Sequence, residues 1–438
     1  MPLRHLTSLA VAFMLALNCV PAAAQDAPAS GDTSDTSDEI STSNIPLDEI
    51  RRYVAVYSAV KAAYVEPVDD ADLMDSAIRG LLLDLDPHSA YLQDDAADNF
   101  EEQSRGNYDG IGVEIFRQPD GTLRVIAPID DTPAARAGIK AGDLIVAVDG
   151  KPLSAGDDDT STTLRGEPGT AVELTIERDG VDKPLTLTVQ RETIRIASVR
   201  GKMLEPGYGY IRVSAFQADT AADFERKLAE LQEQSGGRLR GLVLDLRSNP
   251  GGLLTAAVQI ADALLDEGRI VSTRGRIAIS DATFSATPGD RLHGAPVVVL
   301  VDAGSASASE VLAGALRDNN RARVVGSRTF GKGSVQTLLP LDNGDSVKLT
   351  TARYYTPSGE SIQALGIVPD VVLHAADGAE NGGQAPFSEA DLPGHLSGDG
   401  EDLPGINAGD VLDGESYVTA ALVELKKQVA AASPASKG

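Results

Sequence analysis

Between Ile194 and Leu373, short apolar runs alternate with longer helical stretches, and this rhythm constrains the fold more than any other feature of the chain. Short continuous apolar runs are typical of strands buried on both faces, because a strand with one solvated face shows alternating polar residues. Helical runs between such strands favour an α/β core. The expected strands are Gly241–Leu246, Val297–Asp302 and Ala322–Val325, and the expected helices are Leu253–Leu265 and Ala308–Arg317.

The stretch from Gly106 to Arg191 has a different residue pattern, with short β-rich runs separated by Asp-Gly turns. Such spacing predicts a compact, mostly β module of about 85 residues. One short helix is expected at Ala134–Ala137, closed by Gly138. The expected strands are Leu123–Ile129, Leu144–Val148, Val172–Glu177 and Leu185–Val189.

Residues 1–24 have the anatomy of a cleavable secretory signal, with a basic start, an apolar run over Leu6–Leu17 and a small-residue end. Cleavage would leave a chain that begins at Gln25. Cys19, the only cysteine, lies inside this signal, so the mature chain would have neither a disulfide nor a thiol nucleophile. Lipid attachment at Cys19 is the competing interpretation, although Asn18 stands where a small residue is expected.

The remaining ends of the chain are polar. Residues 25–46 are rich in Ser, Thr, Asp and Ala without a basic residue, which predicts a disordered acidic linker. Helical spacing predicts helices over Leu47–Tyr64 and Leu73–Leu85. Residues 376–438 are expected to form an acidic flexible segment and a closing helix at Ser416–Ala430.

The formal net charge is −27, and most of the basic residues are scattered singly. Nucleic acids and anionic lipids bind clustered basic side chains, so neither is expected as a partner. No window after the signal has the roughly eighteen apolar residues needed to span a bilayer. These features predict a soluble mature protein.

Functional residue types are concentrated in two stretches of the α/β region. Residues 301–313 hold Ser305, Ser307 and Ser309 where a strand is expected to turn into a helix, and residues 326–337 hold Lys332 between two glycines. Backbone N–H groups at a helix start can stabilise an oxyanion, which suits an oxygen nucleophile. The residues alone do not choose among the three serines.

A serine hydroxyl needs a base to accept its proton, and the five histidines lie in no recognisable catalytic motif. A lysine can serve if its pKa falls from about 10.4 to near 7, which corresponds to about 4 kcal/mol and requires burial among apolar groups. Lys332, close to Phe330 and Val335, suits that demand. Taken alone, a serine-rich helix start is more often a cap, and a lone lysine is more often a solvated turn residue.

These two stretches resemble the carboxyl-terminal processing peptidases, also called tail-specific proteases, of serine peptidase family S41. The matching segments are Ser-Ala-Ser-Ala-Ser-Glu at 305–310 and Phe-Gly-Lys-Gly-Ser-Val-Gln at 330–336. The resemblance implies that Ser307 is the nucleophile, that Lys332 is the general base, and that Gln336 orients the lysine.

The resemblance extends from about Leu47 to Leu373 and implies an oxyanion hole. In Asp-Leu-Arg-Ser-Asn-Pro-Gly-Gly at 245–252, the N–H of Gly251 or Gly252 would act together with that of Ala308. The segment Leu-Asp-Pro-His-Ser-Ala-Tyr at 85–91 also fits the family. One departure is Ala364, which stands where the family pattern has glycine.

The β module resembles a PDZ domain. Gly110, Ile111, Gly112 and Val113 would form the turn and strand that bind a terminal carboxylate, while the bound tail adds to the sheet edge. Arg165 resembles an arginine that couples this module to the protease site in some relatives.

The fold class implied by the resemblance is multidomain α/β: a crotonase/ClpP-like α/β protease core, an inserted-looking, mostly β PDZ domain and an N-terminal helical segment. The expected divisions are 1–24, 25–46, 47–106 (helical), 107–191 (PDZ), 192–375 (protease core) and 376–438.

The expected function is that of an exported, periplasmic serine endopeptidase, loosely associated with a membrane at most, that cleaves envelope proteins near their C-termini. No metal or cofactor is expected. The expected partners are proteins with apolar C-terminal tails, with an adaptor protein as a further candidate and a homo-oligomer as the expected assembly.

Three alternatives compete with this interpretation. The first is a catalytically silent PDZ scaffold that only binds protein tails. The second is a Ser/Lys acyltransferase or penicillin-binding enzyme, but Ser-x-x-Lys at 58–61 lacks its companion motifs. The third is a nucleotide-binding loop at 326–332, where Gly333 replaces the Ser or Thr that would bind magnesium.

Overall fold

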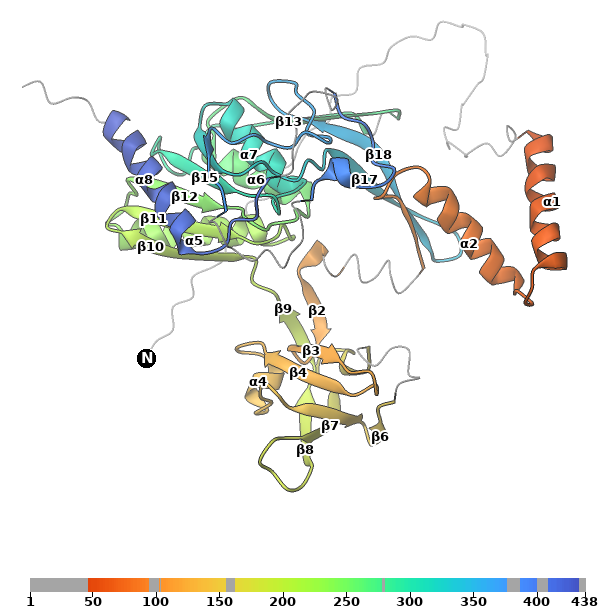
Figure 1. Cartoon of the computed structure of the whole chain (residues 1–438). Helices are drawn as coiled ribbons and strands as arrows, with labels where there is room; N and C mark the ends of the chain where they lie inside the picture. The colour runs from red at the N-terminus through yellow and green to blue at the C-terminus, as the bar shows by residue number, and fades with distance from the viewer. Residues whose placement is uncertain are drawn as a thin grey trace, which may run out of the picture. The chain divides into compact units, whose positions relative to one another are not determined.

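The computed structural model describes residues 46–93, 102, 104–154, 162–277, 280–375, 387–399 and 409–432 (Figure 1). The chain divides into two compact units, Met1–Asp69 and Asp70–Gly438, which are described separately. In the first unit, helix α1 (Leu47–Ala63) has acidic residues in its first turn and Lys61 in its last, which complements the helix dipole. None of the helices in the described parts of the chain is long and apolar enough to cross a membrane.

The second unit contains a six-stranded sheet in the order β10-β11-β12-β15-β16-β19. Its strands are parallel except for β10, which is antiparallel to β11. β12 and β15 are buried along their whole length, which explains their continuous apolar sequences. The strands are β10 (Val199–Glu205), β11 (Tyr208–Val213), β12 (Gly241–Asp245), β15 (Val297–Val301), β16 (Ala322–Gly326) and β19 (Val371–Val372).

Helices cover both faces of this sheet (Figure 1). Leu242 and Leu244 of β12 pack in one apolar cluster with α5 (Thr220–Gln234), α6 (Leu254–Leu264) and α7 (Ala308–Asp318). Val243, which points the opposite way, packs with α8 on the other face. This last helix, α8 (Glu415–Ala432), is the helix predicted at Ser416–Ala430.

A second sheet lies beside this core and is built on a long hairpin. The hairpin strand β18 pairs with β17, β13 and β1, so it joins segments that are far apart in the chain. Helix α2 (Asp70–Leu83) precedes β1. The strands are β1 (Ala90–Leu92), β13 (Arg269–Gly275), β14 (Ala282–Ser285), β17 (Ser334–Pro340) and β18 (Ser346–Tyr355).

The mostly β module has its own sheet, in the order β3-β4-β5-β7-β8, and its own apolar core. The two-stranded pair β2 (Asn107–Gly110) and β9 (Glu192–Arg195) lies where the chain enters and leaves the module. The four predicted strands and the short predicted helix are all present. The remaining elements are β3 (Val113–Arg117), β4 (Leu123–Pro128), α4 (Pro133–Arg136), β5 (Leu144–Val148), β6 (Lys151–Pro152), η2 (Thr162–Leu164), β7 (Ala171–Glu177) and β8 (Leu185–Gln190).

Parts of the acidic stretch expected to be flexible pack against the core. Glu389, in the short helix η4 (Glu389–Asp391), and Leu412 are both buried. The Arg247 guanidinium donates to the Leu412 carbonyl at 2.7 Å. Composition could not indicate this, because hydrogen bonds from the core hold these segments. The prediction for 376–386, 400–408 and 433–438, like those for the signal and the linker, lies outside the described residues.

Candidate active site

The strand β15 ends at Val301, and the chain turns into α7 at Ser307. Ser307 is the N-cap of α7 and has φ 54° and ψ −114°, a conformation that a non-glycine residue adopts only under strain. Such strain is common where a side chain must be held in an unusual direction. The first N–H groups of α7 lie next to the Ser307 hydroxyl.

The other two serines of the motif are engaged in the interior. The Ser305 hydroxyl donates to the Leu246 carbonyl at 2.8 Å, and the Ser309 hydroxyl donates to the Asn249 carbonyl at 2.9 Å. Both side chains are fully buried. Of the three serines, Ser307 is the one that lines the large pocket described below.

Lys332 lies in the loop between β16 and β17 and is largely buried. Burial lowers the pKa of its ammonium group, and the positive charge of Lys348 lowers this pKa further. Three nearby carboxylates have the opposite, weaker effect: Glu389, Asp86 and Glu310. The net direction favours the neutral amine that a general base requires.

The Glu310 carboxylate connects the serine segment to the lysine loop. One oxygen accepts the backbone N–H groups of both Ser307 (2.7 Å) and Lys332 (2.9 Å). The other accepts the Thr329 hydroxyl (2.5 Å) and the Gly331 N–H (2.7 Å). Glu310 is fully buried, and burial raises the pKa of its carboxyl group to about 7 although the hydrogen bonds oppose this shift.

Sequence reasoning included Glu310 in a motif but assigned it no role. The available signal was its position three residues after Ser307, because a glutamate at that spacing commonly accepts the N-cap backbone N–H. Tyr354 of β18 was also missed. Its hydroxyl interacts with the Ser307 side chain, while burial raises the pKa of Tyr354 to about 12.

Gln336 projects from β17 into the same pocket as Lys332. Its amide nitrogen donates to the Ser334 hydroxyl at 3.0 Å and to the Thr350 hydroxyl at 3.2 Å. Thr350 in turn donates to the Asp86 carboxylate at 3.0 Å. The expected glutamine thus lines the same pocket as the lysine, and its amide is held by hydrogen bonds to β17 and β18.

The two glycines expected to form the oxyanion hole lie against Ser307. A Cβ on Gly251 would be 2.9 Å from the Ser307 Cβ and 3.1 Å from the Ala308 nitrogen. The Gly251 N–H already donates to the Asn249 side chain at 2.9 Å. A Cβ on Gly252 would lie 2.1 Å from the Phe216 carbonyl oxygen, so only glycine fits there.

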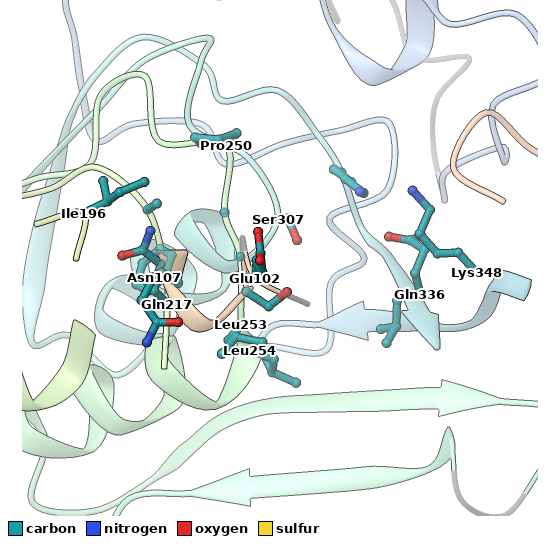
Figure 2. A pocket seen from close by; sticks show the side chains of 18 of the residues that line it. Glu102, Asn107, Ile196, Gln217, Pro250, Leu253, Leu254, Ser307, Gln336 and Lys348 are labelled. Atoms are coloured by element: carbon teal, nitrogen blue, oxygen red, sulfur yellow. The ribbon is translucent and has the colours of Figure 1, made fainter. Parts of the chain in front are cut away.

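These residues line one pocket of about 700 Å³ (Figure 2). Figure 2 shows Ser307 in the interior, with Gln336 and Lys348 on one side and Ile196 on the other. The apolar part of the lining includes Ile196, Phe216, Leu253, Leu254, Val335 and Tyr354. An apolar pocket with a few polar groups is a typical small-ligand or side-chain site.

The expected carboxylate-binding turn of the β module joins β2 to β3. Gly112 has φ 78°, and a Cβ there would come within 2.4 Å of Thr132. The Ile111 side chain is buried in the module's core, so it packs the turn rather than facing a ligand. Gly110 and Val113 mark the ends of the two strands that flank this turn.

Arg165, by contrast, lines the pocket that contains Ser307. Its guanidinium pairs with the Glu102 carboxylate and lies 5.4 Å from the centre of the Tyr108 ring. Among the described residues, Gly110–Val113 do not line this pocket. The structure therefore brings one of the five residues expected on the β module to the pocket.

Comparison with known proteins finds a family match for three regions of the chain. Residues 207–373 match peptidase family S41, residues 124–178 match the PDZ domain family, and residues 11–96 match the N-terminal domain of the activating protease CtpB. The chain is 42% identical to the carboxy-terminal-processing protease of Bartonella bacilliformis over 80% of this chain and 81% of that protein. The chain belongs to the carboxy-terminal processing proteases of family S41.

Other relatives include the carboxy-terminal processing protease CtpA of Bacillus subtilis, which is 34% identical over 82% of this chain and 74% of that protein. The solved photosystem II D1 C-terminal processing protease is 34% identical over 75% of this chain and 94% of that chain, with a TM-score of 0.43. The expected multidomain α/β fold with a PDZ domain and an S41 core is confirmed, and the protein is a serine-type, C-terminal processing peptidase.

Proposed function

We propose that this carboxy-terminal processing protease uses Ser307 as its nucleophile and Lys332 as its general base. The observation that carries the proposal is the Glu310 carboxylate oxygen, which accepts the backbone N–H groups of both residues. This shared acceptor keeps the two segments next to each other. The lowered pKa of Lys332 supports the proposal, because it favours the neutral amine that a general base requires.

In the first step, the Lys332 amine takes the Ser307 hydroxyl proton while the serine oxygen attacks the scissile carbonyl carbon. The oxygen of the tetrahedral intermediate would accept the N–H groups of Ala308 and Gly252. We favour Gly252 over Gly251 because the Gly251 N–H is already bonded to Asn249.

The intermediate then collapses: the carbon–nitrogen bond breaks, and Lys332 returns its proton to the leaving amine. In the second half, Lys332 takes a proton from water, and the resulting hydroxide attacks the ester of Ser307. The acid product leaves and Ser307 regains its proton. Gln336 would orient the lysine from β17, and no step requires a metal or cofactor.

Substrate choice would involve two sites. The apolar residues that line the pocket of Ser307 suit an apolar side chain close to the cleaved bond. In the PDZ domain, β3 is an end strand of its sheet, so a peptide can add to its edge while the turn Gly110–Val113 binds the terminal carboxylate. Proteins with apolar C-terminal tails fit both sites.

The cellular setting follows from the signal-like residues 1–24. We infer export to the periplasm, with envelope proteins as substrates. An adaptor that delivers them and a homo-oligomeric assembly are part of this proposal.

The test is Ser307→Ala in the full chain, assayed on a protein with an apolar C-terminal tail. We expect cleavage to fall by at least about a thousandfold while the affinity for the tail stays within twofold. Ser309→Ala is the matched control, and we expect it to retain nearly all activity. Cleavage that persists in Ser307→Ala would rule out the nucleophile. Full tail binding without wild-type cleavage of any tested substrate would favour the silent scaffold.

A further inference from the structure

Glu389 is a fully buried carboxylate in a segment that lies beyond the matched peptidase region. Its two oxygens are 3.0 and 2.8 Å from Nε2 of His88, in the turn that precedes β1. The amide nitrogen of Gln363 donates to one of these oxygens at 2.9 Å. The buried charge therefore has polar partners, as a stable interior charge requires.

Gln363 connects Glu389 to the loop that contains Lys332. Its side-chain oxygen accepts the N–H of Gly333, the residue that follows Lys332, at 3.1 Å. The backbones are also close, because a Cβ on Gly333 would lie 2.2 Å from the Gln363 nitrogen. The Gln363 side chain is fully buried, so its amide has little freedom to turn.

The segment that contains Glu389 also contacts the part of the loop that precedes Lys332. The Glu389 N–H donates to the Phe330 carbonyl at 3.0 Å. The rings of Phe387 and Phe330 pack with centroids 6.2 Å apart. The loop is thus held two residues before Lys332 and one residue after it.

The charge of Glu389 also acts on the lysine. It raises the pKa of Lys332, in opposition to burial and to Lys348, while Asp86 and Glu310 act in the same direction as Glu389. A neutral glutamine would cost less to bury than a carboxylate. The Glu389 carboxylate therefore affects Lys332 electrostatically as well as through packing.

We propose that Glu389 is a positioning residue for the active site. Its carboxylate, held by His88, fixes Gln363 and with it the loop that presents Lys332 to Ser307. This inference rests on the proposed role of Lys332 as the base.

The test compares Glu389→Ala with Glu389→Gln in the full chain, each with kcat and KM measured from pH 5 to 10. For Glu389→Ala we expect kcat to fall at least tenfold with KM within twofold. Glu389→Gln keeps an acceptor for Gln363, so we expect a smaller loss of kcat. In both variants the acid limb of the kcat/KM profile should move to lower pH, because the lysine loses a neighbouring negative charge.

Asp391→Asn is the matched control, because Asp391 is an exposed carboxylate in the same short helix and accepts from Ser388. We expect its kcat and its pH profile to stay at wild-type values. His88→Asn removes the imidazole that contacts the Glu389 carboxylate, and it should reproduce part of the loss of kcat seen in Glu389→Ala. Circular dichroism and the melting temperature establish that each variant is folded.

Wild-type kcat and an unmoved pH profile in folded Glu389→Gln would overturn the inference, and so would an equal loss in Asp391→Asn. If Glu389→Ala does not fold, the near-isosteric Glu389→Gln decides. Ser307→Ala separates this inference from the proposed function: cleavage that persists there disproves the dyad, whatever Glu389 does.

Discussion

At the scale of single residues, Glu310 illustrates how one carboxylate can serve both packing and chemistry. Its two oxygens accept four hydrogen bonds, and the donors belong to the serine segment and the lysine loop. No water is needed to satisfy these donors. An amide in its place could accept on one oxygen only, so two buried donors would lose their acceptor.

We expect Glu310→Gln to lower the free energy of unfolding by about 2–4 kcal/mol and kcat by at least tenfold. The pKa of Glu310 is raised from 4.5 to about 7. Stability from this group is therefore fully present below pH 4.5 and is lost as the pH rises through 7, by about 3 kcal/mol.

The measurement is the free energy of unfolding in urea between pH 4 and 8. In wild type it should fall as the pH rises, and in Glu310→Gln the part of this fall that comes from Glu310 should be absent. Glu233→Gln, an exposed change on α5, is the control and should keep the wild-type slope. An unchanged slope in Glu310→Gln would contradict the assignment of the raised pKa.

At the scale of elements, the hairpin of β17 and β18 contributes four residues to the pocket: Val335, Gln336, Lys348 and Tyr354. Because β18 also pairs with β1 and β13, the hairpin is fixed from several sides. A rigid element holds catalytic groups in place better than a free loop does.

Lys348 on this hairpin lowers the pKa of Lys332. Replacing Lys348→Met removes its charge but keeps an apolar stem. We expect the pKa of Lys332 to rise, so the acid limb of the kcat/KM profile moves to higher pH and activity at pH 7 falls severalfold. Lys348→Arg retains the charge and should keep the wild-type profile; an identical shift in both variants would argue against an electrostatic effect.

Much of the element pattern could be predicted from sequence, because buried strands and amphipathic helices each have a distinct periodicity. The buried strands β12 and β15 and the strands of the PDZ domain appear where expected. The residues around Glu389 could not be predicted this way. Their stretch is acidic and glycine-rich, and only partners distant in the chain make the carboxylate stable when buried.

The candidate site was likewise only partly predictable from the sequence. The motifs indicated Ser307 and Lys332, but not the Glu310 hydrogen bonds that join them, since those depend on three-dimensional contacts. The departure at Ala364 is informative in retrospect. This residue has φ 59°, a left-handed conformation in which glycine carries no strain, so the alanine is tolerated at a cost of about 1 kcal/mol.

At the scale of the whole molecule, Arg165 lies in the module that contains the PDZ domain and lines the pocket that contains Ser307. Its pairing with Glu102 and its position over Tyr108 give this contact both charge and packing. Both charged side chains are about one-third exposed, so the pair is open to solvent screening. We expect the pair to affect the coupling between the PDZ domain and the pocket rather than the free energy of unfolding.

We expect Arg165→Met to reduce turnover of a tail-bearing substrate severalfold, towards the rate of the same substrate without its tail. The affinity of the PDZ domain for the tail should stay within twofold, because the Arg165 guanidinium is engaged by Glu102 and Tyr108. Steady-state kinetics and calorimetric titration measure the two quantities. The charge reversal Arg165→Glu with Glu102→Arg should recover part of the turnover; equal losses for both substrates would disprove the coupling.

The position of α8 has a consequence for how the protease matures. This helix covers the apolar underside of the central sheet with Val418, Leu422 and Leu425. A growing chain that has not yet reached Glu415 lacks the helix that packs on this face. Before residue 387 it also lacks the contacts of Phe387 and Glu389 with the loop that contains Lys332. The apolar face of the sheet and the loop that contains Lys332 are therefore completed only by residues 387–425, which are synthesised after the strands that they cover.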